Sequence, residues 1–264
     1  MILYHLGIGA GAATTDPAEL KYVYEEGLRV LPSFGVIPAF SMLQDMLRLS
    51  GMDVELSQIP HGEQDLHLHD VLPANGDVRT SANVCEVSDK GKAALVVLET
   101  VTRYARSDKP LVTNRFSAFI RGEGGFDDAD GRRPPAAAPP EPPDRVPDVV
   151  VDCPTLPQQA LLYRLSGDMN PIHVDPEFAR RGGFDRPILH GLCSYGMVCK
   201  AVVDNVLGGE VERGARYRAR FAGVVFPGEV ITVRMWREKA AVLFEALSKE
   251  RGSVVLSNAS IELR

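Results

Sequence analysis

Residues 163–191 read YRLSGDMNPIHVDPEFARRGGFDRPILHG, and they hold the densest cluster of reactive side chains in the chain. Asp168, Asn170 and His173 lie within six residues of one another, and a glycine and a proline interrupt the segment. Because glycine and proline break helices and strands, we expect an irregular loop here, followed by a short helix from about Pro176. A carboxylate and an imidazole five residues apart on such a loop can both reach one water molecule. The pattern therefore predicts a general acid/base pair.

The composition is that of a soluble globular protein. A chain of 264 residues is long enough for one large domain or two small ones. Its net charge of −6 arises from 29 basic and 35 acidic side chains, and it gives no sign of a surface for nucleic acid or anionic membranes. No run of eighteen apolar residues is present, and no basic segment precedes an apolar one at the N-terminus. We expect a cytoplasmic protein without membrane insertion.

The cysteines indicate neither a metal site nor redox chemistry. Cys85, Cys153, Cys193 and Cys199 are scattered, with no CxxC pair and no metal-ligand spacing. Cys193 and Cys199 fall in an apolar helical segment, where buried thiols are common. We therefore expect inert core thiols, no bound metal and no redox cofactor.

A proline-rich segment divides the chain. Residues 127–147 contain seven of the 19 prolines. Such a segment cannot bury apolar surface and is expected to be an extended linker. It separates a predicted N-terminal domain, residues 1–126, from a predicted C-terminal domain, residues 148–264.

Both halves show helical segments followed by strands. Residues 17–29 are predicted to be helical, and residues 32–51 are apolar and partly helical with a break at Pro38. Residues 187–207 are predicted to form a helix that is apolar nearly all round, which other structure must cover. A buried helix and a curled antiparallel sheet form a hot-dog unit, and two such units in tandem can share one sheet. The predicted fold is thus an α+β double hot dog, with strands at 61–68, 76–87, 93–104, 111–120, 215–224, 230–237, 241–248 and 254–263.

The two halves also share an internal repeat. Residues 4–17 align without a gap on residues 163–176, and LPANGDV at 72–78 corresponds to VFPGEV at 225–230. The identical pairs are Tyr4 with Tyr163, Leu6 with Leu165, Asp16 with Asp175, and Pro17 with Pro176. In this alignment Asp168, Asn170 and His173 lie opposite Gly9, Gly11 and Thr14. The sequence therefore predicts chemistry in the second copy alone.

The segment LSGDMNPIHVDPEFA and the downstream PILHG resemble the signature of the MaoC-like (R)-specific enoyl-CoA hydratases, known as hydratase 2. HGEQ at 61–64 and FIRGEGGF at 119–126 are similar to the N-terminal signatures of the two-domain members. The resemblance covers essentially the whole chain. It implies a non-catalytic N-terminal hot dog that binds the acyl chain and CoA, and a catalytic C-terminal one.

The resemblance implies reversible syn addition of water to a trans-2-enoyl-CoA, giving the (3R)-3-hydroxyacyl-CoA, with CoA as part of the substrate rather than a cofactor. Asp168 and His173 would hold the catalytic water, and Asn170 would support the loop and the water. The amide of Gly191 would bind the thioester oxygen. The free amides and dipole of a helix N-terminus favour such a developing negative charge. Which of Asp168 and His173 takes the first proton is left open.

Substrate contacts are predicted from His61, Gly62, Arg121, Gly122, Pro187 and His190. His61, together with Glu63 and Gln64, could instead tie the two halves together or line the acyl cavity. His190 could equally be a satisfied structural histidine.

Other residues near the loop have simpler interpretations. Arg180, Arg181 and Arg186 could meet CoA phosphates or remain solvated. Asp175 is expected to cap the helix that follows it. By the same resemblance, the region around Pro38 leaves space for a long acyl tail.

Three other functions remain as alternatives. They are a (3R)-hydroxyacyl-thioester dehydratase acting on carrier-protein substrates in fatty-acid elongation, a hot-dog thioesterase, and a non-catalytic acyl-CoA binding protein. The acyl chain length, the physiological direction and the oligomeric state are also open, and a homodimer is plausible.

Overall fold

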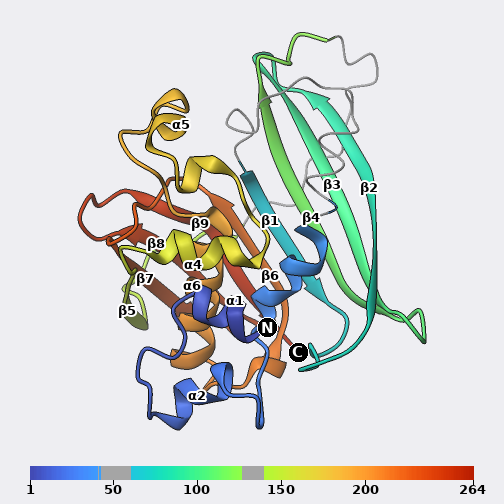
Figure 1. Cartoon of the computed structure of the whole chain (residues 1–264), viewed down its shortest axis with the longest axis vertical. Coiled ribbons are helices and arrows are strands. Elements are labelled where there is room, and N and C mark those ends of the chain that lie inside the picture. The colour runs from blue at the N-terminus through green and yellow to red at the C-terminus, as the bar shows by residue number, and fades with distance from the viewer. Residues whose placement is uncertain (41, 43–60, 127–139) are drawn as a thin grey trace.

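The structure is a computed structural model that describes residues 1–40, 42, 61–126 and 140–264. Its strands are β1 (His61–Leu68), β2 (Val78–Asp89), β3 (Ala93–Tyr104), β4 (Pro110–Arg121), β5 (Val149–Pro154), β6 (Gly214–Phe221), β7 (Val230–Arg237), β8 (Ala241–Ser248) and β9 (Val254–Leu263). They form one antiparallel sheet in the order β2-β3-β4-β1-β6-β9-β8-β7-β5 (Figure 1). Strands of both halves therefore belong to a single sheet.

The helices lie on one side of this sheet, away from its edge strand β2 (Figure 1). They are α1 (Ile2–Gly7), α2 (Pro17–Val23), η1 (Pro32–Val36), α4 (Gln159–Tyr163), η3 (Arg164–Ser166), η4 (Pro171–His173), α5 (Pro176–Arg181), α6 (Gly191–Asn205) and η5 (Val211–Arg213). None of the helices in the described residues is long and apolar enough to cross a membrane. The longest of them, α6, is the predicted buried helix.

The sheet order repeats about its centre. From the joint between β1 and β6, the first half runs outward as β1-β4-β3-β2 and the second half as β6-β9-β8-β7. The corresponding strands occur in the same sequence order in both halves, and β5 adds to the outer edge of the second half. The predicted tandem of two units that share one sheet is confirmed.

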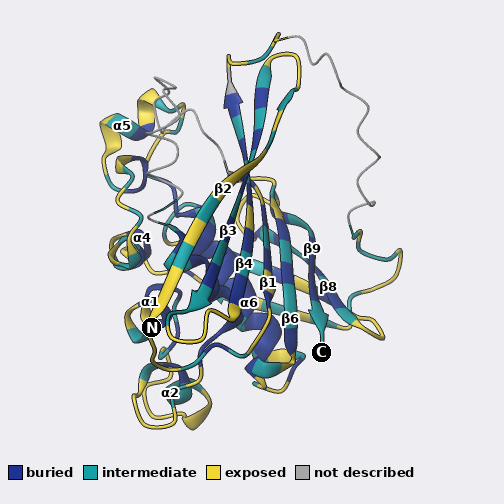
Figure 2. Cartoon of the chain, turned by 90° about the vertical axis from the view of Figure 1, so that its right-hand side faces the viewer, coloured by how far each residue is buried: buried dark blue, intermediate teal, exposed yellow. Residues whose placement is uncertain are grey.

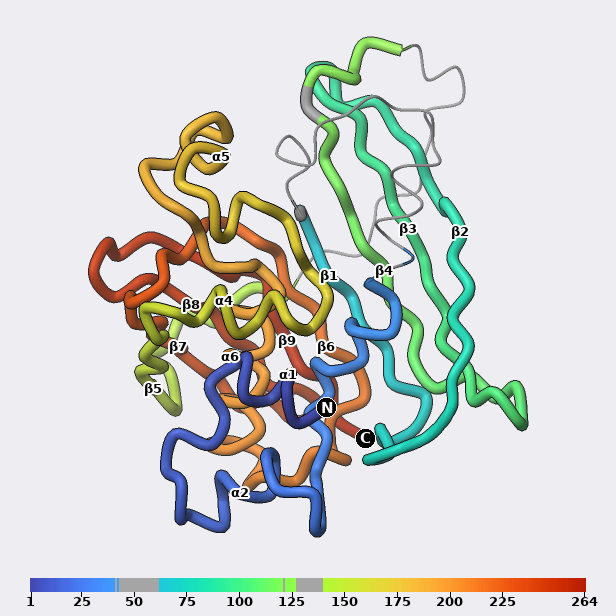
Figure 3. The backbone as a smooth tube through the Cα atoms, in the orientation of Figure 1, coloured from blue at the N-terminus to red at the C-terminus, as the bar shows by residue number. Residues whose placement is uncertain are grey.

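The helix α6 is enclosed on all sides, as its sequence requires. Eleven of its fifteen residues are buried. Figure 3 traces the N-terminal segment of the chain (blue) alongside α4 and α6. Gly196 permits this approach, because a Cβ there would lie 2.7 Å from both the Tyr4 hydroxyl and the Ile8 Cγ2. The N-terminal segment thus packs on the central helix of the second half.

The aligned repeat segments adopt matching structures. Asp16 and Asp175 each cap a short helix, and each is followed by a proline at the first helical positions. The rings of Tyr4 and Tyr163 meet edge to face with centroids 6.0 Å apart. The alignment without a gap is therefore structurally consistent, and the predicted capping role of Asp175 is confirmed.

Several sequence predictions need correction. The helix predicted from Pro187 begins at Gly191, because the intervening residues extend and their amides bond elsewhere: Ile188 N–H donates to the Ile172 carbonyl and Leu189 N–H to the Val225 carbonyl. The helix predicted for residues 17–29 ends at Val23. The strands agree to within about three residues, whereas β5, α1 and α4 were not predicted.

Two further predictions are only partly described. Most of the segment 32–51 lies outside the described residues, which include η1 and a helical turn at residues 37–40. Of the proline-rich linker, residues 127–139 also lie outside them. Residues 140–147 have no regular secondary structure, and the Arg145 carbonyl accepts a hydrogen bond of 2.9 Å from Trp236 Nε1.

The prediction of core thiols is confirmed for Cys193 and Cys199, the two cysteines of the apolar helix. Cys193 and Cys199 are buried and Cys153 is half-buried, but Cys85 is exposed on β2. This strand forms the edge of the sheet, and Figure 2 shows much of its length exposed. An edge strand without a covering layer leaves side chains on both of its faces in contact with solvent.

Acid pH should destabilise the fold through His5. This residue is fully buried, its Nδ1–H donates to the Tyr22 carbonyl at 2.6 Å, and its Nε2 accepts the Leu31 N–H at 3.3 Å. Burial lowers the pKa of His5 to about 4. Between pH 6.5 and 4 the unfolded chain therefore binds the extra proton, and the free energy of unfolding falls as the pH falls, by about 3 kcal/mol from this residue. Urea unfolding across this range should show a shallower pH slope in His5→Gln than in the wild type; equal slopes would contradict the assignment.

Candidate active site

The loop between η3 and α5 is built by its own polar side chains. Gly167 ends η3 with a φ of 122°, a conformation that favours glycine. The Asp168 Oδ1 accepts the Asn170 N–H at 3.1 Å, and the Asn170 Oδ1 accepts the Ile172 N–H at 3.1 Å. Asn170 thereby caps η4, which carries His173. The observed contacts of Asn170 support the loop, in line with part of its predicted role.

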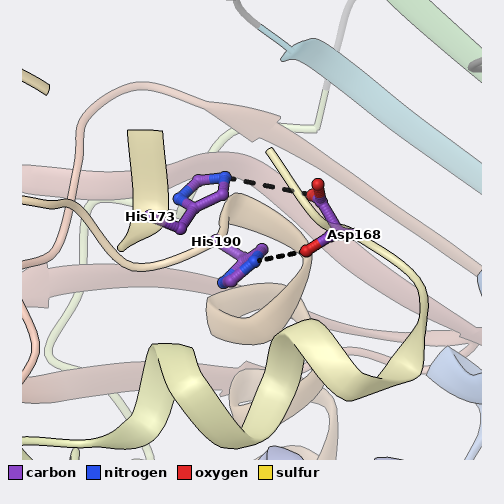
Figure 4. Close-up of side chains that lie close together, drawn as sticks. All are labelled: Asp168, His173 and His190. Atoms are coloured by element: carbon purple, nitrogen blue, oxygen red, sulfur yellow. Dashed lines mark hydrogen bonds and ion pairs between the residues drawn. The ribbon is translucent and has the colours of Figure 1, made fainter. Parts of the chain in front are cut away.

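Asp168 and His173 face each other across a short gap. The distance from Asp168 Oδ2 to His173 Nε2 is 3.9 Å (Figure 4), too long for a direct hydrogen bond. The Nδ1 of His173 lies 2.9 Å from the Ile188 carbonyl oxygen. Because a carbonyl only accepts, Nδ1 carries the proton, and the neutral ring presents an unprotonated Nε2 to Asp168. The pair can hold one water molecule between a carboxylate and a lone pair.

Burial controls the charges of this pair. It raises the pKa of Asp168, an effect that His173 opposes. It lowers the pKa of His173, an effect that Asp168 opposes. The imidazole of His173 is therefore neutral at neutral pH, as a proton acceptor must be.

His190, the residue directly before α6, joins this cluster. The ring is 1% exposed, and its Nε2–H donates to the Asp168 carbonyl oxygen at 3.1 Å. It stacks on His173 with ring centroids 3.7 Å apart and an angle of 26° between the ring planes. Figure 4 shows the three side chains together. Residues 22 positions apart in sequence thus meet at one site.

Gly191 follows His190 and begins α6. The first amides of an α-helix have no acceptor within the helix, so the Gly191 N–H is left to partners outside it. A Cβ at this position would lie 3.1 Å from the Phe221 ring, a contact tighter than side chains normally make. A glycine amide at the N-terminus of a fifteen-residue helix is suited to stabilise an oxyanion.

The other predicted substrate residues come from the first half of the chain and from the segment before α6. His61 and Gly62 belong to β1, Arg121 ends β4, and Gly122 follows it. Pro187 opens the extended segment that leads to His190. Among the described contacts, none links Gly62 or Gly122 to the cluster of Asp168, so their substrate role stays a prediction.

The strand β1 itself connects the two halves. It pairs with β4 on one side and with β6 on the other, and Glu63 lies opposite Arg220. Gln64 is buried and donates from Nε2 to Asn114 Oδ1 at 2.9 Å. The backbone pairing of β1 with β6 therefore fits the alternative interpretation, that this motif ties the halves together, whereas the side-chain bond of Gln64 lies within the first half.

The arginines near the loop have mixed environments. Arg180 is exposed, Arg181 lies over the Phe178 ring at 5.0 Å, and Arg186 lies over the Phe226 ring at 4.7 Å. The contact of these arginines with CoA phosphates stays a prediction.

Sequence reasoning missed Arg164, one turn before Asp168. Its Nε is buried, and no acceptor for it lies among the described residues. Its positive charge lowers the pKa of Asp168, as a smaller contribution than burial, His173 and the Asn170 amide. The signal available in the sequence was the position of Arg164 next to the signature segment that carries Asp168.

Known proteins match both halves of the chain. Residues 1–122 match the family of MFE-2 hydratase 2 N-terminal domains, and residues 137–259 match the MaoC-like domain family. The chain is 43% identical over 262 residues to enoyl-CoA hydratase ChsH3 of Mycobacterium tuberculosis, which covers 98% of this chain and 90% of that protein. It is 38% identical over 275 residues to 3-hydroxyacyl-thioester dehydratase Y of the same organism, and the match covers 99% of this chain and 90% of that protein.

A solved structure shares the fold over the whole chain. The full-length peroxisomal multifunctional enzyme type 2 of Drosophila melanogaster superimposes with a TM-score of 0.83 and 34% identity, over 100% of this chain and 46% of that one. The protein belongs to the two-domain MaoC-like hydratases, the hydratase 2 family. The predicted family, the hydro-lyase class and the α+β double hot-dog fold are confirmed.

Proposed function

We propose that this protein is an (R)-specific enoyl-CoA hydratase, which adds water reversibly to a trans-2-enoyl-CoA and forms the (3R)-3-hydroxyacyl-CoA. The observation that carries the proposal is the buried pair of Asp168 and His173, separated by 3.9 Å between Oδ2 and Nε2. This pair is linked through His190 to the amide of Gly191. A water site and an oxyanion site therefore belong to one unit.

In the proposed reaction, one of the two groups takes a proton from the water as its oxygen bonds to C3 of the substrate. The electron pair of the double bond moves onto the thioester oxygen, where the Gly191 amide stabilises the enolate. The enolate then collapses as C2 takes a proton from the pair. Because Asp168 and His173 hold the same water, hydroxyl and proton arrive from one face of the double bond, which is syn addition.

We propose that this chemistry needs neither a metal ion nor a redox cofactor. Ligand atoms of Asp168, His173 and His190 do lie within 4.8 Å of one another. One nitrogen of each imidazole is bonded to a backbone carbonyl, and the two rings stack with centroids 3.7 Å apart. The proposed steps use only the acid/base pair, its water and the Gly191 amide, so they require no ion.

The N-terminal half, residues 1–126, is proposed to bind the acyl chain and CoA, while residues 148–264 catalyse. An apolar cluster on β3 and β4, separate from the main core, supports this assignment: Ala94, Val96, Leu98, Phe116, Ala118 and Ile120. His61, Gly62, Arg121, Gly122 and Pro187 are retained as proposed substrate contacts. A homodimer and a cytoplasmic location stay predictions.

Loss of the enoyl-thioester absorbance tests the function. Purified protein should remove this band from crotonyl-CoA and from a longer trans-2-enoyl-CoA without releasing free thiol. Free CoA as the main product would identify a thioesterase instead. Activity on enoyl or 3-hydroxyacyl carrier-protein thioesters with none on CoA esters would identify the elongation dehydratase. Binding without turnover on either carrier would identify an acyl-CoA binding protein.

A further inference from the structure

We propose that His190 is a positioning residue, which holds the water-binding pair and the oxyanion amide in one fixed arrangement. The inference rests on the proposed hydratase function and assigns His190 a role other than the substrate contact expected from sequence. Three kinds of observation carry it: a backbone hydrogen bond, a ring stack and an unpartnered ring nitrogen.

The hydrogen bond joins the two halves of the site. The Asp168 carbonyl can only accept, so the proton of His190 lies on Nε2. The backbone that carries the carboxylate is thereby tied to the residue directly before Gly191. A shift of the loop relative to the start of α6 would break this bond. The bond therefore fixes the water site relative to the oxyanion site.

The stack sets the plane of the His173 ring. The hydrogen bond from His173 Nδ1 to the Ile188 carbonyl still allows the His173 ring to rotate about that bond. The His190 ring, with its centroid 3.7 Å away and its plane at 26°, restricts this rotation. His190 is itself held by Tyr163, whose ring centroid lies 4.9 Å away and which is 1% exposed. The Nε2 lone pair of His173 is thus aimed at Asp168 by a packed column of rings.

The charged and titratable groups around His190 favour its neutral form. Burial, and then His173, lower the pKa of His190 well below its usual value, while the Asp168 carbonyl raises it and Arg164 lowers it. A protonated His190 would place a positive charge against the His173 ring, whose unprotonated Nε2 faces Asp168. The neutral His190 ring orients His173 without that charge.

A comparison with His5 separates positioning from simple packing. His5 is equally buried, and both of its ring nitrogens have backbone partners. In His190, by contrast, the buried Nδ1 has no partner in the described part of the chain. Buried polar atoms without partners are uncommon and cost stability. A role of His190 in the site, rather than in the fold, explains why this unpartnered nitrogen lies beside Asp168 and His173.

Two substitutions each remove one of the two contacts of His190. His190→Phe keeps a flat ring against His173 but loses the donor to Asp168, whereas His190→Gln keeps a donor and loses the ring. We expect kcat per folded molecule to fall about 10- to 100-fold in each variant, with KM unchanged, because misplacement of reacting groups affects turnover. His5→Gln is the matched control, which should lose stability and keep the wild-type kcat.

The outcomes distinguish the inference from the function on which it rests. Folded fractions are measured by circular dichroism, and rates by loss of crotonyl-CoA absorbance. Wild-type kcat in either folded variant would overturn the positioning role, and a raised KM with unchanged kcat would restore the substrate contact. If both variants lose kcat only in proportion to their folded fraction, His190 is merely structural. A wild-type protein that hydrates nothing would overturn the proposed function itself.

Discussion

Replacement of Asp168 by asparagine is expected to lower kcat for enoyl-CoA hydration by about 10²- to 10⁴-fold. The asparagine oxygen can still accept the Asn170 N–H, so the loop should keep its shape. The group that faces His173 across 3.9 Å would become an amide, which can neither take up a proton from water nor return one to the substrate. Initial rates with crotonyl-CoA, together with the melting temperature, test this expectation.

Asp175→Asn is the matched control for this experiment. Asp175 lies seven residues further on, and its carboxylate caps α5 by accepting the Glu177 and Phe178 amides. Asparagine caps helices about as well as aspartate. This variant should therefore keep the wild-type rate. An Asp168→Asn variant that also keeps most of its kcat would remove Asp168 from the chemistry.

The second large effect is expected at Gly191, where proline can delete the amide without breaking the helix. Proline is well tolerated at the first helical position. His190, the residue before it, has φ −57° and ψ 132°, which a following proline permits. Removing one oxyanion donor costs about 10²- to 10³-fold in kcat. We expect a loss of this size in Gly191→Pro relative to Gly191→Ala.

Alanine is the necessary reference because both side chains add a Cβ. That atom meets the Phe221 ring at 3.1 Å in either variant, so the loss from this contact is shared. Only the proline variant lacks the N–H, whose place the ring Cδ takes. Equal kcat values in the two variants would show that the Gly191 amide does not stabilise the reacting oxygen.

The strands were predictable because their sequence pattern is local. In β3 and β8, buried and partly exposed residues alternate regularly, as expected for strands with one covered face. The start of α6 was placed too early because Ile188 and Leu189 are held by bonds to distant carbonyls. The short β5 was missed for a similar reason. Its six residues are too few to predict a strand by themselves, and the hydrogen bonds to β7 stabilise it.

Part of the candidate site was likewise predictable from the sequence, and part was not. The spacing of Asp168 and His173 on a short loop is visible in the sequence, and so is their absence from the first copy. There Gly9 and Gly11 occupy the corresponding positions with φ of 84°, a conformation that suits glycine. The stack of His190 on His173 arises from tertiary packing. Neither a ring orientation nor a tautomer can be read from residue spacing.

The stereochemistry of hydration tests the central claim most directly. Trans-2-decenoyl-CoA would be incubated with the wild type and with Asp168→Asn, and the 3-hydroxyacyl product would be assigned by chiral chromatography. The account predicts the 3R product from the wild type and almost none from the variant. A 3S product, or equal yields from the two proteins, would contradict it.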